Sequence, residues 1–127
     1  MRIDVTDPED AIRQVAGTCD IFLCFYVFEL IPTPEYGERV LRIARELLAP
    51  GGLALIQVKY DDGRLLTKPR RRFRRSAVAA LTTYPIPSFW KLAANCGFKP
   101  EMIHLVPRNE LDERYAYFLM TKESPVP

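Results

Sequence analysis

The sequence has 127 residues, with 48% apolar and 27% charged side chains and a net charge of +2. These values fit one globular domain with a hydrophobic core, and they exclude a multidomain chain. The longest apolar run begins at Ile21 and is ended by Glu29, which is far shorter than the roughly 20 residues of a membrane span, so we expect no transmembrane helix. The first ten residues carry acids where a signal peptide carries a basic and then an apolar segment, so we expect no export and a cytoplasmic protein.

The first part of the chain predicts a strand, a helix and a second strand. Residues 2–6 are typical of the end of a strand. Asp7 and Pro8 then open a helix, with proline at its first position and acids in its first turn, and Gly17 ends it. Residues 21–28 are a continuous apolar run rich in aromatic and β-branched types. Such a run predicts a central strand that is buried on both faces.

The middle of the chain predicts a βαβ unit. A helix starts at Thr33 and Pro34, carries apolar residues on one face and charged residues on the other, and ends at Pro50-Gly51-Gly52. Residues 53–58 follow directly as another buried strand. Two strands joined by one helix and a short turn are expected to run parallel, with a right-handed crossover.

The last part of the chain predicts a helix followed by an antiparallel hairpin. The helix opens within residues 85–88 and is ended by Gly97 in the left-handed conformation. Residues 98–106 and 114–121 are predicted strands around a polar loop. Residues 123–127 are expected to form a frayed tail.

Cysteine and histidine offer little chemistry. The three cysteines, Cys19, Cys24 and Cys96, lack the paired spacing of zinc or redox sites, which favours reduced thiols in the cytosol. His104 is the one histidine, and we expect it to be a partly exposed strand residue and not a base. With no cluster of acids beside it, the sequence predicts no metal site.

A basic segment, residues 68–75, reads K-P-R-R-R-F-R-R. It is either a solvated surface that aids solubility or an anion-binding surface, because arginine forks bind phosphate and carboxylate groups. Only Phe73 lies between the charges, so a platform for stacking nucleic-acid bases is thin and nucleic acid is the weaker alternative. The residues expected to contact an anionic substrate are Arg70, Arg71 and Arg72.

Four segments of the chain carry a resemblance to a known family. Residues 27–32 read V-F-E-L-I-P and residues 48–52 read L-A-P-G-G. Residues 89–100 read F-W-K-L-A-A-N-C-G-F-K-P, and residues 115–120 read Y-A-Y-F-L-M. In this order they resemble the C-terminal half of the class I S-adenosylmethionine-dependent methyltransferases, whose fourth strand commonly ends in V-L-E-H-I-P. Leu30 replaces that histidine here.

The resemblance implies an α/β fold: an open, Rossmann-like methyltransferase sheet, truncated at its N-terminal side, with parallel central strands and an antiparallel C-terminal hairpin. Residues 1–127 would form a single incomplete domain. The family's first strand carries G-x-G-x-G, and its second strand ends in an acid that binds the ribose. Neither is present in this sequence. The pocket for S-adenosylmethionine would therefore be about half built.

The resemblance also implies a site, at the carboxyl ends of the strands, where open parallel sheets bind ligands. By resemblance, Asp7 with Pro8 would contact the adenine, although Asp7 is also a good helix cap. The segment that would line the methionine part of the cofactor is Phe25, Tyr26 and Val27, although apolar side chains are more often core. The residues that would face the methyl acceptor are Glu29, Lys59, Tyr60 and Tyr84, and of these Glu29 and Tyr60 are the candidate catalytic residues.

Without the family's first strand, residues 21–28 would expose an apolar edge with unpaired backbone groups. We therefore expect a second protein chain, or a second copy, to pair at this edge. The expected function is methyl transfer from S-adenosylmethionine to a small molecule by the complete assembly, and the cofactor binds only if the missing strands are supplied. The alternatives are a non-catalytic methyltransferase-like subunit that stabilises or regulates a partner protein, and a nucleic-acid-binding module.

Overall fold

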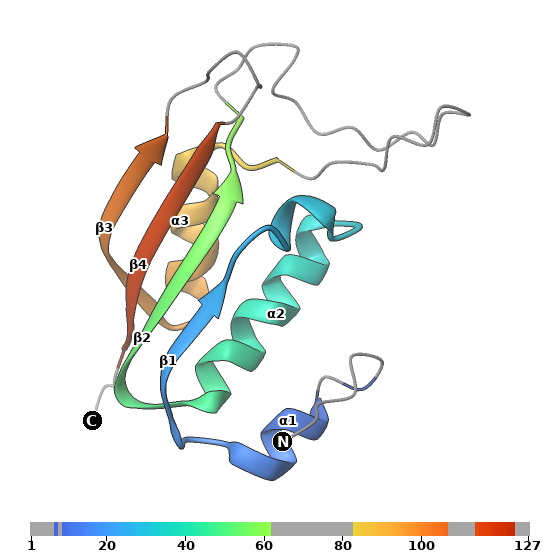
Figure 1. The fold of residues 1–127 in the computed structure, drawn as a ribbon, viewed down its shortest axis with the longest axis vertical. Coiled ribbons are helices and arrows are strands. Elements are labelled where there is room, and N and C mark those ends of the chain that lie inside the picture. Colours follow the sequence, from blue (N-terminus) through green and yellow to red (C-terminus); the bar gives the residue numbers. More distant parts are fainter. Residues whose placement is uncertain (1–6, 8, 62–82, 107–113, 124–127) are drawn as a thin grey trace.

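The computed structural model describes residues 7, 9–61, 83–106 and 114–123 (Figure 1). These residues form an α/β fold around a four-stranded sheet with the order β1-β2-β4-β3. The predicted strand over residues 2–6 and most of the predicted tail lie outside the described residues. The elements in chain order are α1 (Glu9–Val15), β1 (Cys19–Cys24), the 3-10 helix η1 (Phe28–Leu30), α2 (Pro34–Leu47), β2 (Leu48–Lys59), α3 (Ile86–Asn95), β3 (Phe98–Val106) and β4 (Tyr115–Lys122).

The βαβ unit forms as the sequence predicts. β1 runs parallel to β2, and α2 connects them. The Thr33 hydroxyl caps α2 by accepting a hydrogen bond from the Tyr36 N–H at 3.2 Å, and Pro34 occupies the first turn. After α2, Gly51 adopts a φ of +75°, a left-handed conformation that glycine adopts without strain. β2 is longer than predicted, since it already begins at Leu48.

The antiparallel hairpin is also confirmed. β3 and β4 pair antiparallel, and β4 then inserts between β3 and β2. Gly97 ends the preceding helix with a φ of +88°, as its position predicts. No helix of the described residues is long and apolar enough to cross a membrane.

The hydrophobic core lies between one face of the sheet and the two longer helices. Ile56 in β2 and Phe118 in β4 are fully buried, and Leu41 of α2 and Phe89 of α3 pack into the same cluster. Because all four belong to one core, α2 and α3 cover the same face of the sheet. α1 is short and packs against α2.

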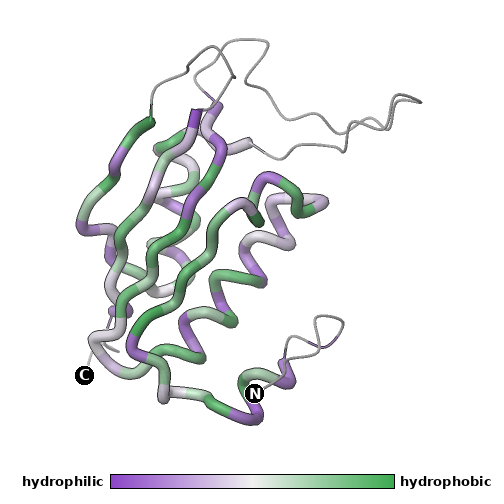
Figure 2. The backbone as a smooth tube through the Cα atoms, viewed as in Figure 1, coloured by the Kyte–Doolittle hydropathy of each residue, from purple (hydrophilic) through white to green (hydrophobic). Residues whose placement is uncertain are grey.

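The structure corrects the prediction for residues 21–28 in two ways. First, the strand ends at Cys24; Tyr26 has a φ of +58°, and the chain then turns so that Phe28 enters η1 and is buried among the helices. Second, β1 lies at the margin of the described sheet, and Ile21 and Leu23 are each 60% exposed. The strand is hydrophobic along most of its length (Figure 2), but within the described residues only one of its faces is covered.

Candidate functional site

The candidate site lies where the parallel strands β1 and β2 end. Residues 25–29 follow β1, and Tyr60 and Asp61 follow β2. Tyr60 and Tyr84 form an isolated parallel bridge, in which the Tyr84 N–H donates to the Lys59 carbonyl at 3.0 Å and the Asp61 N–H donates to the Tyr84 carbonyl at 2.8 Å. The structure therefore brings the predicted residues Lys59, Tyr60 and Tyr84 to one edge.

Glu29 is the best-supported polar residue of this edge. Its carboxylate lies 3.9 Å from the Lys59 ammonium, and both side chains are only 12% exposed. The Tyr115 hydroxyl donates to the two carboxylate oxygens at 3.3 and 3.4 Å, and the Lys59 ammonium lies 5.8 Å from the centre of the Tyr115 ring. A carboxylate with so little exposure to solvent requires partners of this kind to stay charged. Glu29, Lys59 and Tyr115 thus form a connected polar cluster, which we call the carboxylate cluster.

A buried amide fixes the loop after β1. Gln57 in β2 is 1% exposed, and its Oε1 accepts a hydrogen bond from the Tyr26 N–H at 2.5 Å. Its Nε2 donates to the Tyr117 hydroxyl at 3.0 Å. Tyr26 is held in the left-handed region, which is uncommon for a residue with a side chain. The hydrogen bond from the Tyr26 N–H to Gln57 therefore stabilises this uncommon backbone conformation, and the bond to Tyr117 holds the Gln57 amide in place.

The loop that Gln57 holds presents apolar surface to solvent. Phe25 is 40% exposed, Tyr26 59% and Val27 44%, so these three side chains are not core. Phe25 packs edge-on against Tyr117 with ring centres 6.0 Å apart, and Tyr26 does the same with Tyr115 at 5.6 Å. The loop is thereby a supported apolar wall beside the carboxylate cluster.

Tyr84 differs from the other acceptor-facing candidates, because it is only 4% exposed. Its ring packs between Phe28 and Phe89, with centres 6.3 and 5.2 Å away. Tyr84 thus supports the site from within the core, whereas Tyr60 is half-buried. Contact of either side chain with a methyl acceptor stays a prediction.

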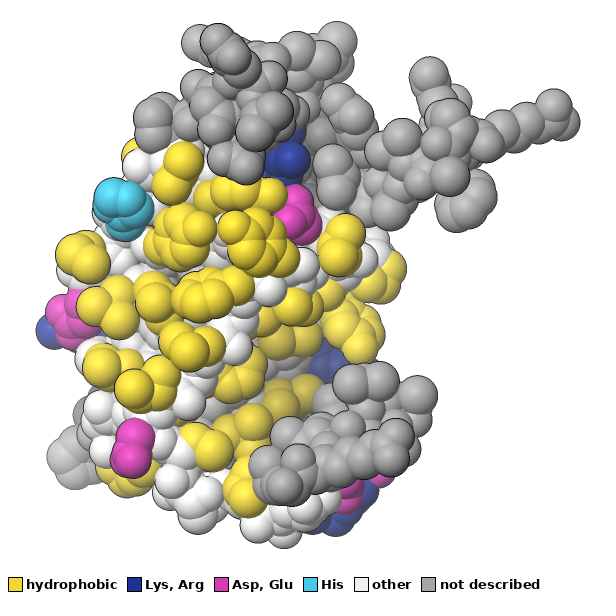
Figure 3. All heavy atoms as spheres, in the orientation of Figure 1, with side chains coloured by type: hydrophobic (Ala, Val, Ile, Leu, Met, Phe, Trp, Pro, Cys, Tyr) yellow, Lys and Arg dark blue, Asp and Glu magenta, His cyan; other side chains and the backbone are white. Residues whose placement is uncertain are grey.

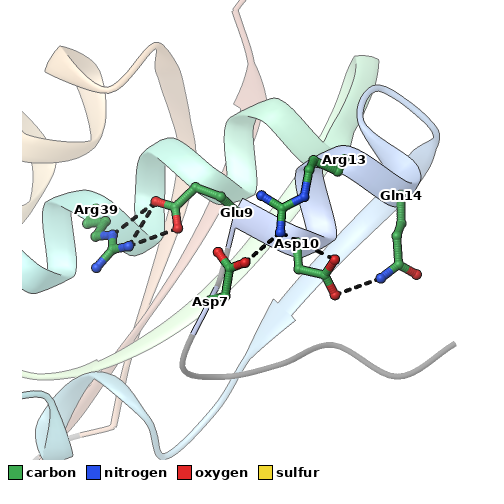
Figure 4. A network of polar contacts seen from close by, with 6 residues as sticks. All are labelled: Asp7, Glu9, Asp10, Arg13, Gln14 and Arg39. Atoms are coloured by element: carbon green, nitrogen blue, oxygen red, sulfur yellow. Dashed lines mark hydrogen bonds and ion pairs between the residues drawn. The ribbon is translucent and has the colours of Figure 1, made fainter.

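Asp7 lies apart from the rest of the site. Its carboxylate forms an ion pair with Arg13 of α1 at 2.5 Å (Figure 4). Its backbone carbonyl accepts a hydrogen bond from the Asp10 N–H. Among the described contacts, Asp7 is joined to its own helix and not to the loop after β1. Pro8 and the predicted anion-binding residues Arg70, Arg71 and Arg72 lie outside the described residues.

The Cys24 thiol is buried, and the His104 ring is exposed. Burial raises the pKa of the Cys24 thiol to about 11, which keeps it protonated at neutral pH. His104 is exposed on β3, with its ring centre 6.3 Å from that of Tyr117. In the part of the chain that the structure describes, no group of acids, histidines and cysteines is arranged to bind a metal ion.

Three residues of the site were not predicted from the sequence: Gln57, Tyr115 and Tyr117. Gln57 did carry a signal, since it is the one polar residue in the run L-A-L-I-Q-V and a polar group in a buried strand needs a partner. The two tyrosines alternate with apolar residues along β4, which shows that they share a face, but the sequence gives no indication of which loop lies above them.

Comparison with known proteins agrees with this fold. No family model matches the chain, and no curated protein matches its sequence. Among solved structures, the chain is similar to the 1,6-didemethyltoxoflavin-N1-methyltransferase of Burkholderia thailandensis, bound to 1,6-didemethyltoxoflavin and S-adenosylhomocysteine, with a TM-score of 0.70 and 21% identity over 89% of this chain and 48% of that one. It is also similar to a SAM-dependent methyltransferase of Methanosarcina mazei, with a TM-score of 0.68 and 11% identity over 87% of this chain and 62% of that one.

A third similar structure is a complex from Haloferax volcanii between a methyltransferase activator and a provisionally assigned methyltransferase. Its TM-score is 0.64, with 9% identity over 89% of this chain and 57% of that one. The chain therefore has a methyltransferase-like fold and spans between about half and three fifths of the length of these solved proteins. At such low identities, the likeness concerns the fold alone.

Proposed function

We propose that this chain supplies one half of an S-adenosylmethionine-dependent methyltransferase that acts on a small molecule, and that another polypeptide segment completes it. The observation that supports this function best is the exposed apolar wall of Phe25, Tyr26 and Val27, held by Gln57 beside the carboxylate cluster. Ligands bind at this edge of an open parallel sheet. The domain is then incomplete by itself, and we place the assembly in the cytoplasm.

Different residues would contact S-adenosylmethionine and the methyl acceptor. S-adenosylmethionine supplies an electrophilic methyl group on its sulfonium, so the protein mainly has to orient the acceptor and remove its proton. Phe25, Tyr26 and Val27 would hold the apolar methionine part, and Asp7 with Pro8 would contact the adenine. Glu29 would accept a proton from the acceptor, with Lys59 and Tyr60 beside it. The glycine-rich turn of this family is absent from the sequence, so these residues fit one side of the cofactor.

Titration calorimetry tests the proposal. S-adenosylmethionine injected into the purified chain should give no binding heat, whereas heat should follow once a polypeptide carrying the missing glycine-rich strand is present. The variant Phe25→Ser should weaken this binding, and the matched variant Leu105→Ser, at a similarly exposed site elsewhere, should not. Equal binding by the chain alone would contradict the proposal.

A second candidate function is a non-catalytic subunit that binds and stabilises a partner through the edge of β1. Within the described sheet β1 has no strand partner on one side, which supports this candidate, and a provisionally assigned methyltransferase of similar fold occurs in a complex with an activator protein. A stable complex that gives no heat with S-adenosylmethionine would favour this candidate. Nucleic-acid binding by the basic segment is the weakest alternative; an affinity that stays constant as salt rises would count against phosphate contacts.

A further inference from the structure

One face of the sheet carries no helix in the described part of the chain, because α2 and α3 both pack on the other face. Leu23, Leu55, Leu119 and Met102 are register partners in one row across all four strands of this uncovered face. Ile21 and Leu53 pair in the adjacent row. We call this surface the open face, and Figure 3 shows hydrophobic side chains gathered over it.

The open face is exposed to a degree that is unusual for a single chain. Ile21 and Leu23 are 60% exposed, Met102 56% and Leu53 37%. Contiguous apolar patches of this kind usually mark interaction surfaces. In the row of Leu53 the residues become polar toward β3, since Leu53 is followed across the sheet by Thr121 and then Lys99, whereas the row of Leu23 stays apolar as far as Met102. The apolar surface is therefore widest over β1 and β2 and, within the described sheet, reaches the edge of β1 that has no strand partner.

The edge of β1 borders the open face, so an occupant can contact both. Within the described sheet β1 pairs with β2 alone, so the other side of its backbone has no strand partner. Parallel strands normally have both faces covered and both neighbours present. An occupant that covers only the face, or only the edge, would leave the other half exposed.

A second copy of this chain cannot cover the open face and pair with the edge of β1 at the same time. Two copies joined by antiparallel pairing of their β1 edges would be related by an axis perpendicular to the sheet, so both open faces would point to the same side and stay uncovered. Two copies packed face to face would cover the apolar rows and leave both β1 edges unpaired. The geometry favours a different polypeptide segment.

We propose that one polypeptide binds both surfaces, adding a strand beside β1 and laying an amphipathic helix across the open face. This inference rests on the proposed function, since it defines the segment that would complete the methyltransferase. The solved proteins of similar fold are long enough to include such a segment, because the chain spans only 48% and 62% of two of them. The apolar rows require leucine-like and aromatic residues on the helix face that they contact.

Site-specific photocrosslinking tests this in the cells that make the protein. Benzoylphenylalanine is placed at Leu23, at the border of the open face and the edge, or at Leu105 as a matched control. Leu105 is 48% exposed but pairs with the fully buried Ala116, which puts it on the other side of the sheet. We expect an adduct at Leu23 alone, mapped by mass spectrometry to an amphipathic helix of a polypeptide that also carries a strand followed by G-x-G-x-G.

Several results would overturn the proposal: no adduct at Leu23, an adduct with a second copy and with no other polypeptide, an adduct within the chain to residues 62–82, a polypeptide without these features, or equal labelling at Leu105. With the captured polypeptide in hand, Leu23→Asp should weaken binding at least about tenfold, and Leu105→Asp should not. Thermal unfolding of both variants alone should match that of the unchanged chain. A complex that forms in this way but does not bind S-adenosylmethionine would refute the proposed function and leave the interface intact.

Discussion

At the scale of single residues, Gln57 determines how the loop after β1 is presented. Its amide is almost fully buried and joins the Tyr26 backbone to the Tyr117 hydroxyl. Tyr26 adopts a left-handed conformation, so the loop would relax to another shape if this acceptor were lost. One polar residue in an apolar strand thus controls the exposed wall that the proposed function requires.

We predict that Gln57→Leu destabilises the chain by about 1–3 kcal/mol, because it leaves the Tyr26 N–H without its acceptor and keeps the strained backbone. Urea unfolding followed by circular dichroism measures this change. Tyr117→Phe is the matched control, since it removes one hydroxyl and keeps the ring against Phe25, and it should cost about 1 kcal/mol or less. A smaller loss for Gln57→Leu than for Tyr117→Phe would contradict this role.

The residues of the site show how far a sequence can be interpreted at this scale. Glu29 was predicted from the resemblance, as a residue that would face the methyl acceptor. Its partners were only half predictable: Lys59 ends the neighbouring strand, but Tyr115 is 86 positions away and reaches Glu29 only because β4 inserts next to β2. Strand order is a tertiary property, which short sequence patterns do not determine.

At the scale of elements, α2 depends on a glycine in its first half. A Cβ on Gly37 would collide with the Tyr84 hydroxyl and would lie 3.0 Å from Ile31 Cδ1 and 3.2 Å from Phe28 Cε1. The absence of a side chain therefore lets α2 approach Tyr84 and the segment from Phe28 to Ile31 closely.

We predict that Gly37→Ala destabilises the chain by roughly 1–3 kcal/mol through overpacking, although alanine favours a helix by about 1 kcal/mol. Chemical denaturation measures the change. Combined with Tyr84→Phe, which removes the atom that the new methyl group meets, the same substitution should cost less than it does alone. Additive costs in this double-mutant cycle would contradict the proposed collision.

The attachment of α1 to α2 should depend on pH. Arg39 of α2 donates two of its N–H groups to the Glu9 carboxylate at 2.8 and 2.9 Å, and this hydrogen bonding is the main cause that lowers the pKa of Glu9 below its usual 4.5. A lowered pKa means that the contribution to stability is complete above the usual value and is lost as the pH falls through the lowered one.

Hydrogen-exchange protection of α1, corrected for the intrinsic rate, should therefore decrease as the pH falls through the lowered pKa of Glu9. Glu9→Gln should give the same loss at neutral pH. Glu38→Gln is the control, because Glu38 pairs with Arg42 inside α2 and its loss should leave α1 unchanged. Equal protection of α1 in all variants would show that its apolar contacts hold it on α2 without the ion pair between Glu9 and Arg39.

The elements themselves were largely predictable, and their ends were not. Periodicity and glycine positions located α2, α3 and the hairpin, because each helix and turn has local signals. The run over residues 21–28 has no polar break, so nothing local marks the change from strand to turn at Phe25. That turn depends on Gln57, which lies on another strand. Long-range hydrogen bonds of this kind determine where a strand ends when the composition of the apolar run does not.

At the scale of the whole molecule, the described helices α2 and α3 pack against one face of the sheet only. The buried core joins α2 and α3 to one face, while the other face leaves Ile21 and Leu23 more than half exposed. Since burial of apolar area drives both folding and association, the chain should fold around its core and still bind apolar partners through the open face.

We therefore predict that the isolated chain self-associates as its concentration rises and binds the hydrophobic dye ANS. The double variant Ile21→Lys with Leu23→Lys should shift sedimentation toward the monomer and reduce dye fluorescence, without lowering the melting temperature, because the replaced side chains contribute little to the core. The control is Leu105→Lys with Trp90→Lys, which changes two exposed apolar residues, 48% and 41% exposed, in elements away from β1. If association depends on the open face and not on general surface hydrophobicity, the control should remain as associated as the unchanged chain. An equal gain of monomer in both double variants would mean that any exposed apolar residue drives association, and the open face would lose its special role.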